Sequence, residues 1–154
     1  MHLARNGHDV LATWHSKGRR RPPGDLQGLA FAVLDLTDRE AVRSMMGARK
    51  FDGIVHTAAV VDSGDQLEAL PHLVKANIGA VGNLVDAAKH NGCPRFVFTS
   101  SISVYGGGDS PESGFYENFV APDTLYGWSK RSAEEVLDFA VARIPEFSAI
   151  SLRL

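Results

Sequence analysis

Short apolar runs alternate along this chain with longer segments of helical character. The runs are bounded by glycine, proline or polar residues, which predicts β-strands at residues 9–14, 30–34, 53–57, 95–100 and 147–152. Helices are predicted between them at residues 37–46, 72–89 and 125–141. This alternation favours an α/β fold in which helices cover both faces of a parallel sheet.

Local signals set several of the predicted boundaries. Thr37 and Glu40 have the spacing of a capping box, so the helix that ends near Met46 is expected to begin there. Gly92 is expected to end the long middle helix. Residues 15–29 are polar and contain several glycines and prolines, which predicts a surface loop.

Composition narrows the class of protein without naming a function. The 154 residues, 44% of them apolar, suffice for one globular domain over residues 1–154. A net charge of −2 gives no reason to expect a nucleic-acid partner. The single cysteine, Cys93, allows no internal disulfide, which favours a reducing compartment such as the cytoplasm. No apolar run is long enough to cross a membrane, and residues 1–6 lack a signal-peptide core.

Candidate chemistry is concentrated after the strand at residues 95–100. The strand leads into Ser101, and a polar loop then leads to Tyr126 and Lys130, which are four residues apart and share a helix face. A nearby ammonium lowers the pKa of a tyrosine by favouring its phenolate. With a serine hydroxyl beside it, such a phenol can move a proton to and from a substrate oxygen. Each signal alone also fits an ordinary structure, an exposed helix face or a turn.

The order of these features is more specific than any one of them. An apolar strand is followed by Ser101, by Val104-Tyr105-Gly106, by a loop with proline and glycine, and by Tyr126 and Lys130. In this order the chain resembles the extended short-chain dehydrogenase/reductase family, the NAD(P)-dependent epimerases and dehydratases. The resemblance implies a Rossmann-like, doubly wound parallel sheet and catalytic roles for Ser101, Tyr126 and Lys130.

The resemblance also implies cofactor contacts at the ends of the other strands. An acidic residue and a hydrophobic residue there meet the adenine, small residues line the dinucleotide, and an asparagine holds the cofactor region. A helix-leading aspartate is the alternative explanation for the acidic residue, and His56 is assigned no chemistry. Besides Tyr126 and Lys130, the expected cofactor-binding residues are Asp35, Leu36, Thr57, Ala58, Ala59 and Asn77. No metal site is expected.

The choice between NAD and NADP depends on the end of the first strand. Relatives that use NAD tend to place a carboxylate there, on the ribose 2′-hydroxyl. Here the stretch runs from Thr13 to Lys17 with Arg19 soon after, and no carboxylate is present. Hydroxyl and cationic groups suit a 2′-phosphate, so NADP is slightly favoured over NAD, although a solvated basic loop is the plainer interpretation.

The sequence departs from the family pattern at both ends. It lacks the first strand and its Gly-x-x-Gly-x-x-Gly turn, and residues 1–6 look like the tail of the first helix. The C-terminal substrate-binding region is also absent. In the strand order 3-2-1-4-5-6 the first strand is central, so its two neighbours are expected to keep unpaired edges. We therefore expect a chain truncated at both ends, and hypothesise that residues 1–154 cannot fold as an ordinary member.

The predicted function is an oxidoreductase or epimerase/dehydratase that acts on the hydroxyl or carbonyl of a small-molecule substrate. The resemblance implies a sugar nucleotide or a small ketone or aldehyde. A non-catalytic dinucleotide-binding scaffold and an inactive gene fragment are the alternatives. Family members often dimerise through the helix of Tyr126 and the long helix near Asn77, so a homodimer is possible.

Overall fold

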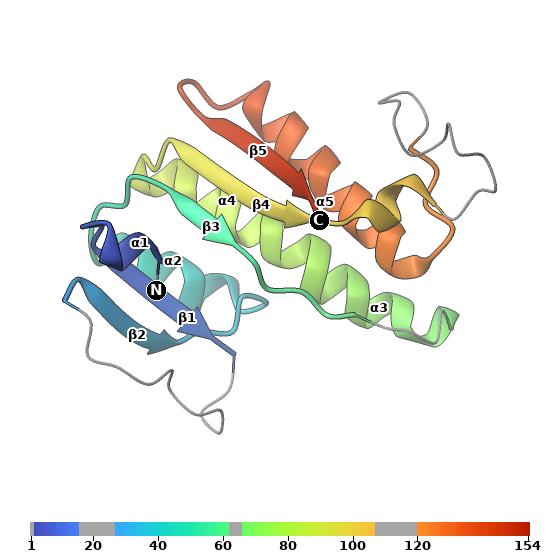
Figure 1. The fold of residues 1–154 in the computed structure, drawn as a ribbon, viewed down its shortest axis with the longest axis horizontal. Coiled ribbons are helices and arrows are strands. Elements are labelled where there is room, and N and C mark those ends of the chain that lie inside the picture. Colours follow the sequence, from blue (N-terminus) through green and yellow to red (C-terminus); the bar gives the residue numbers. More distant parts are fainter. Residues whose placement is uncertain (1, 16–26, 62–65, 107–119) are drawn as a thin grey trace.

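The computed structural model describes residues 2–15, 27–61, 66–106 and 120–154. Within them the chain forms the predicted α/β fold with parallel strands (Figure 1). In order, the elements are α1 (His2–Arg5), β1 (Val10–Trp14), β2 (Leu29–Val33), α2 (Arg39–Gly47), β3 (Ile54–His56), η1 (Leu67–Ala69), α3 (Leu70–Leu73), η2 (Val74–Gly79), α4 (Ala80–Asn91), β4 (Arg95–Ser100), η3 (Ile102–Tyr105), α5 (Leu125–Val141) and β5 (Ser148–Arg153).

The strands form two separate sheets. In the three-stranded sheet, β4 lies between β3 and β5 and is parallel to both, with Phe96 opposite Ile54 on one side and Ala149 on the other. In the two-stranded sheet, β1 pairs with β2 from Val10–Leu29 onward. Among the described residues β1 and β3 share no strand pairing. The predicted unpaired edges are thus confirmed.

A slot separates the two unpaired edges. Residues of β1 (Leu11, Thr13) and all of β3 (Ile54–His56) line a cavity of about 130 Å³ between the sheets. Backbone groups along both edges therefore face a space in which no described strand lies. The sheets are held together instead by helices, because α2 packs against α4.

The core lies between the sheets and the helices α2, α4 and α5. Alternate residues of β4 point into it, and Phe96 and Phe98 are each only 1% exposed. The opposite face of the three-stranded sheet carries Val55, Ile150 and Leu152 in exposed positions. In Figure 1 the helices α4 and α5 lie on one side of that sheet.

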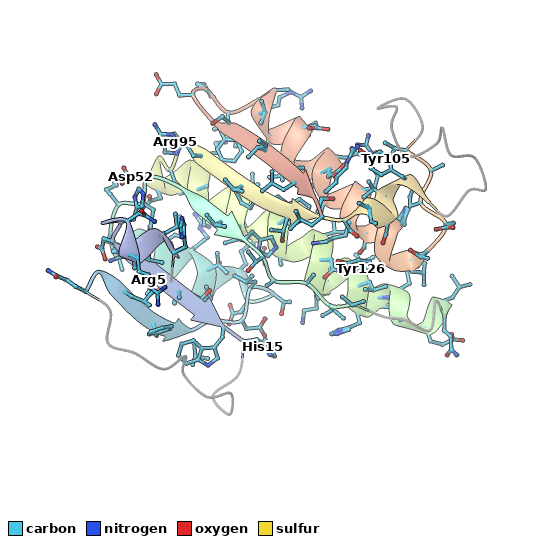
Figure 2. All side chains as sticks on the ribbon, in the orientation of Figure 1. Arg5, His15, Asp52, Arg95, Tyr105 and Tyr126 are labelled. Atoms are coloured by element: carbon cyan, nitrogen blue, oxygen red, sulfur yellow. The ribbon has the colours of Figure 1, made fainter. Side chains whose placement is uncertain are left out.

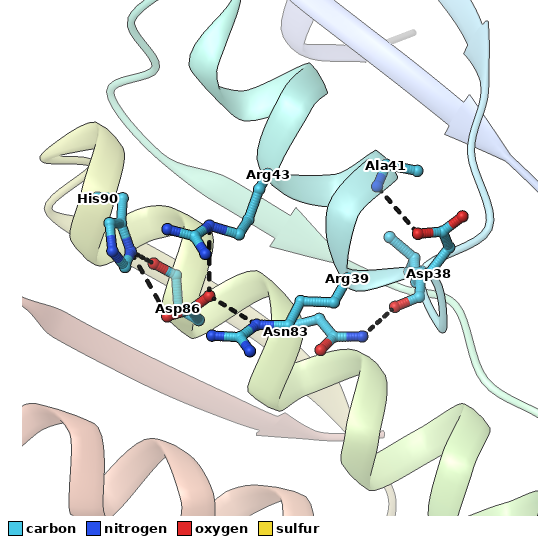
Figure 3. A network of polar contacts seen from close by, with 8 residues as sticks. Asp38, Arg39, Ala41, Arg43, Asn83, Asp86 and His90 are labelled. Carbon is cyan, nitrogen blue, oxygen red and sulfur yellow. Dashed lines mark hydrogen bonds and ion pairs between the residues drawn. The ribbon is translucent and has the colours of Figure 1, made fainter.

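Polar contacts add to the packing of α2 on α4. Asp86 of α4 receives Arg39 at 3.2 Å, Arg43 at 3.8 Å and His90 at 3.5 Å (Figure 3). Burial would raise the pKa of Asp86, but the bond from Arg39 and the neighbouring cations hold it below its usual value. Asn83 of the same helix donates to the Leu36 carbonyl, which joins the segment after β2 to α4.

The predicted capping box at Thr37 and Glu40 is wrong. The N-cap of α2 is Asp38, whose Oδ1 accepts from the Ala41 amide at 3.0 Å, so the helix begins at Arg39. The Thr37 amide is already used, because it donates to Asp35 Oδ1 at 2.8 Å. Aspartate ranks above threonine as an N-cap residue, and the turn at Asp35 also engages the Thr37 amide.

The long middle helix is interrupted where the sequence predicted a continuous one. Residues Val74–Gly79 form a π-helical turn between α3 and α4. Such turns often occur at functional sites, and this one carries Asn77. The predicted stop is confirmed, since Gly92 ends α4 in the left-handed region at φ 75°.

Candidate functional site

The catalytic candidates meet at the carboxyl end of β4. Ser101 directly follows the strand and caps η3, its Oγ accepting from the Ser103 amide at 3.2 Å. Tyr126 lies in the first turn of α5, where the N-cap Thr124 accepts from the Gly127 amide at 3.0 Å. The two side chains therefore come from different elements that meet at one place.

A glycine allows this close approach of α5 to η3. A Cβ added at Gly127 would lie 2.3 Å from the Ser103 carbonyl oxygen, well inside any normal contact. Only glycine fits there without a shift of backbone against backbone. Gly127 therefore places Tyr126 close to the segment that carries Ser101.

Lys130 is buried beneath these two hydroxyls. Its side chain is almost fully enclosed, and its Nζ donates to the Thr99 carbonyl at 2.6 Å. The ammonium also lies 4.4 Å from the centre of the Phe98 ring and 5.9 Å from that of Tyr126. Burial lowers the pKa of Lys130 to about 8, and the charge of Glu134 opposes part of that shift.

The predicted lowering of the Tyr126 pKa is not seen. Burial raises the pKa of the Tyr126 phenol, and hydrogen bonding with Ser101 opposes the rise without cancelling it. The Lys130 ammonium is directed to the Thr99 carbonyl, and it lies nearly 6 Å from the ring of Tyr126. Burial therefore outweighs the hydrogen bonding that lowers the pKa of the phenol.

Asn77 connects the middle helix to the catalytic helix. Its Nδ2 donates to the Val60 carbonyl and to Ser129 Oγ, both at 2.9 Å, and its Oδ1 accepts from the Val60 amide at 2.8 Å. Ser129 Oγ in turn donates to the Tyr126 carbonyl at 2.8 Å. The network joins the segment after β3 to the turn that bears Tyr126.

Sequence reasoning missed Ser129. This residue is completely buried and is the only described side chain that links Asn77 to α5 by a hydrogen bond. Its place directly before Lys130 in the Tyr-x-x-x-Lys segment was visible in the sequence. Its partner was not, because the π-helical turn that directs Asn77 toward α5 has no clear sequence signal.

Four of the predicted cofactor residues line one cavity. Asp35, Leu36, Ala58 and Ala59 border a space of about 160 Å³ beyond the carboxyl ends of β1, β2 and β3. Of the other predicted residues, Thr57 lies just outside the lining and is exposed, and Asn77 is held in the network of Val60 and Ser129.

The cavity also contains groups that the sequence did not single out. Trp14 borders it, and its buried Nε1 has no hydrogen-bond partner among the described residues. His15 borders it too and lies 3.5 Å from the Asp35 carboxylate. A hydrogen bond from the Thr37 backbone is the main cause that lowers the pKa of Asp35. The cavity therefore combines a mostly apolar lining with an unpaired N–H donor and an ionised carboxylate.

Some predicted features lie outside the described residues. They include Lys17 and Arg19, on which the NADP preference was based. Figure 2 places His15 at the end of β1, and Tyr105 and Tyr126 beyond the ends of β4 and β5. In the part of the chain that the structure describes, no group of histidine, cysteine and acidic residues could hold a metal ion, and no helix is long and apolar enough to span a membrane.

A parallel α/β sheet with a serine, a tyrosine and a lysine gathered beyond its central strand defines the class of short-chain dehydrogenases/reductases. Within that class, a family model described as the NAD dependent epimerase/dehydratase family matches residues 1–154. The chain belongs to that family.

Individual relatives agree with this assignment. UDP-glucose 4-epimerase 2 of Oryza sativa subsp. japonica is 31% identical over 129 residues, which cover 82% of this chain and 31% of that protein. The UDP-Glc/GlcNAc 4-epimerase of Campylobacter jejuni matches with a TM-score of 0.84 and 26% identity, over 99% of this chain and 47% of that one.

A third match is MoeE5 in complex with UDP-glucuronic acid and NAD, with a TM-score of 0.78 and 28% identity. It covers 99% of this chain and 48% of MoeE5. The chain therefore spans less than half the length of each of these three proteins.

Proposed function

We propose that the protein acts as an NAD-dependent epimerase or related oxidoreductase on a UDP-sugar. The observation that carries this proposal is the grouping of Ser101, Tyr126 and the buried Lys130 at the carboxyl end of β4. The sugar-nucleotide class is supported by the names of the relatives, which are UDP-sugar epimerases or bind a UDP-sugar.

In this proposal Tyr126 exchanges a proton with the substrate oxygen, and Ser101 donates a hydrogen bond to the same oxygen. A tyrosine phenol is protonated at neutral pH, and burial raises the pKa of Tyr126 further from that range. It is therefore better prepared to give a proton to a carbonyl oxygen than to take one from a hydroxyl. When bound, NAD supplies hydride transfer at the substrate carbon.

Lys130 supports the proton exchange by its charge and its place. With its pKa lowered to about 8, the amine is largely protonated at pH 7 and remains close to the Tyr126 ring. A fixed ammonium stabilises the phenolate that forms when Tyr126 releases its proton. The Thr99 carbonyl prevents Lys130 from turning away.

NAD is the proposed cofactor, with its adenine end in the cavity bordered by Trp14, Asp35 and Leu36. The unpaired Trp14 Nε1 and the Asp35 carboxylate are the polar groups available there. MoeE5 binds NAD according to its description, and nothing in the matches favours NADP. The Asp35 carboxylate, which lies 3.5 Å from His15, is also available to accept a hydrogen bond from a ribose hydroxyl.

Substitution of Tyr126 tests the proposal. In the full-length protein, as the source cells make it, Tyr126→Phe should lower the turnover of UDP-glucose with NAD by about 10²- to 10⁴-fold, the usual contribution of a general acid/base. Binding of NAD, measured by calorimetry, should change little. Trp128→Phe is a matched control, since this aromatic residue on the same helix is 40% exposed. Equal turnover by the Tyr126 variant and the unchanged protein would contradict the assignment.

A further inference from the structure

Three charged or polar side chains form a chain of contacts behind the candidate catalytic residues. Glu134 lies on α5, one turn beyond Lys130, and is only 3% exposed. Arg153 of β5 binds its carboxylate through two nitrogens, Nε at 3.0 Å and Nη2 at 2.9 Å. The remaining Arg153 nitrogen, Nη1, donates to the Tyr105 hydroxyl at 2.8 Å.

The geometry of these contacts is specific. A two-point contact between arginine and carboxylate fixes the plane of the guanidinium, so the direction of Nη1 is also fixed. Arg153 additionally lies with its Cζ 4.8 Å from the centre of the Tyr105 ring. The hydrogen bonds from Arg153 keep the pKa of Glu134 below its usual value in spite of burial, so the pair stays ionised.

Each end of the chain of contacts is attached to a catalytic element. Glu134 is part of the helix that carries Tyr126 and Lys130. Tyr105 is the last residue of η3, the short helix that Ser101 caps. The Ile102 amide at the start of η3 also donates to the Leu154 carbonyl at 3.0 Å, directly after Arg153. Arg153 is therefore placed to hold η3 against α5.

We propose that Glu134, Arg153 and Tyr105 act as positioning residues that hold Ser101 at the phenol of Tyr126. None of the three needs to touch substrate or cofactor for this role. The inference rests on the proposed function only for the importance of the Ser101–Tyr126 contact. The positioning itself is a property of the folded chain and can be measured without substrate.

The test is a pH titration of Tyr126 by NMR in the 154-residue chain labelled with ¹³C at the tyrosine Cζ. Ser101→Ala should raise the pKa of Tyr126, because the Ser101 hydroxyl lowers it. Tyr105→Phe removes one oxygen from the contact chain and should raise the pKa of Tyr126 to a similar value. In the double variant with Ser101→Ala and Tyr105→Phe, the pKa of Tyr126 should be no higher than in Ser101→Ala alone, since both substitutions act through the same contact.

Two further variants separate positioning from general stability. Glu134→Gln weakens the two-point contact that holds Arg153. It should raise the pKa of Tyr126 as well, but by less than Tyr105→Phe does. Arg131→Gln is the matched control, because Arg131 binds Glu134 at 3.2 Å and makes no contact with η3 that the structure records. Its titration should match that of the unchanged chain.

Several results would overturn the proposal. One is a Tyr105→Phe variant that is less stable but titrates normally at Tyr126. Another is a Tyr126 pKa in the double variant that is raised by the full sum of the two single shifts. If the tyrosine signals lost their dispersion in both the Tyr105 and the Glu134 variant, the contacts would serve stability alone. If the unchanged chain itself gave no dispersed tyrosine signals, the geometry of these contacts would be overturned. Because no substrate is used, failure of the proposed enzymatic function leaves the result interpretable.

Discussion

The two sheets of this molecule differ in how their strands are supported. In the three-stranded sheet, β4 has a parallel neighbour on each side and its phenylalanines are fully buried. In the two-stranded sheet, β1 has a described neighbour on one side only and its residues are partly exposed. The catalytic candidates follow β4 of the three-stranded sheet, whereas the proposed cofactor cavity lies where the ends of β1 and β2 meet the segment after β3.

The connection between the two sheets is helical. Asn91 at the end of α4 donates to the carbonyls of Met46 and Arg49, and its Oδ1 accepts from the Phe51 amide. These bonds join α4 to the last turn of α2 and to the segment that follows it. The catalytic half, built on the three-stranded sheet, is thus fixed by its own strands, whereas the proposed cofactor half, built on β1 and β2, is fixed through α2.

Loss of a buried ring should produce the largest effect and the clearest contrast between the sheets. Phe98→Ala should lower the free energy of unfolding by about 3–5 kcal/mol, because this ring is fully buried between the sheet and the helices. Phe31→Ala in β2 should cost about 1–2 kcal/mol, since its ring is only partly buried and packs on Trp14. Urea unfolding of both variants measures the difference. Equal losses would show that the two sheets are supported alike.

Much of the fold could be predicted because its signals are local. The apolar run at residues 95–100 became β4 without a change of boundary, and the helix at residues 125–141 became α5. The unpaired edges of β1 and β3 were expected from the strand order of the family. The N-cap of α2 could not be predicted from spacing alone, because the Thr37 amide donates a hydrogen bond to Asp35 and the helix is capped by Asp38 instead.

The candidate site was predicted in its residues but not in its electrostatics. Ser101, Tyr126 and Lys130 were found from their order along the chain. The raised pKa of Tyr126 depends on how far burial removes water from the phenol and on where Lys130 places its ammonium. Both are tertiary properties. Ser129 was missed for the same kind of reason, because its partner lies on a distant π-helical turn.

The slot between the sheets can be examined through the pH dependence of stability. His56 at the unpaired edge of β3 is 4% exposed, and its Nε2 has no partner among the described residues. Burial, with a smaller contribution from the charge of Lys130, lowers the pKa of His56 to about 4. The unfolded chain therefore binds more protons between about pH 6.5 and 4, and stability should fall as pH falls through this range.

This lowering of the His56 pKa corresponds to a loss of about 3 kcal/mol in the free energy of unfolding as pH falls from above 6.5 to below 4. The pKa values of Asp35, Asp86 and Glu134 are lowered as well, so their contributions are lost mainly below about pH 5, as pH falls from the unfolded toward the folded pKa values. His56→Leu should flatten the profile of the unfolding free energy between pH 6.5 and 4. An equally steep profile in the variant would show that the slot is wet and that His56 is solvated.

The smallest expected effect concerns how closely the catalytic helix approaches its neighbour. Gly127→Ala should destabilise the fold by about 1–3 kcal/mol, because the new methyl group would meet the Ser103 carbonyl and separate α5 from η3. Gly82→Ala in α4 is the matched control. A Cβ there meets nothing within 4 Å, so the higher helix propensity of alanine should stabilise by about 0.5–1 kcal/mol.

Opposite signs at these two helical glycines would show that the contact with η3, and not the glycine as such, holds the catalytic half together. Thermal and urea unfolding of both variants measure the sign. If both substitutions stabilised the chain, α5 and η3 would be free to separate, and Ser101 would no longer be held near Tyr126. The catalytic half would then be fixed no more firmly than the cofactor half.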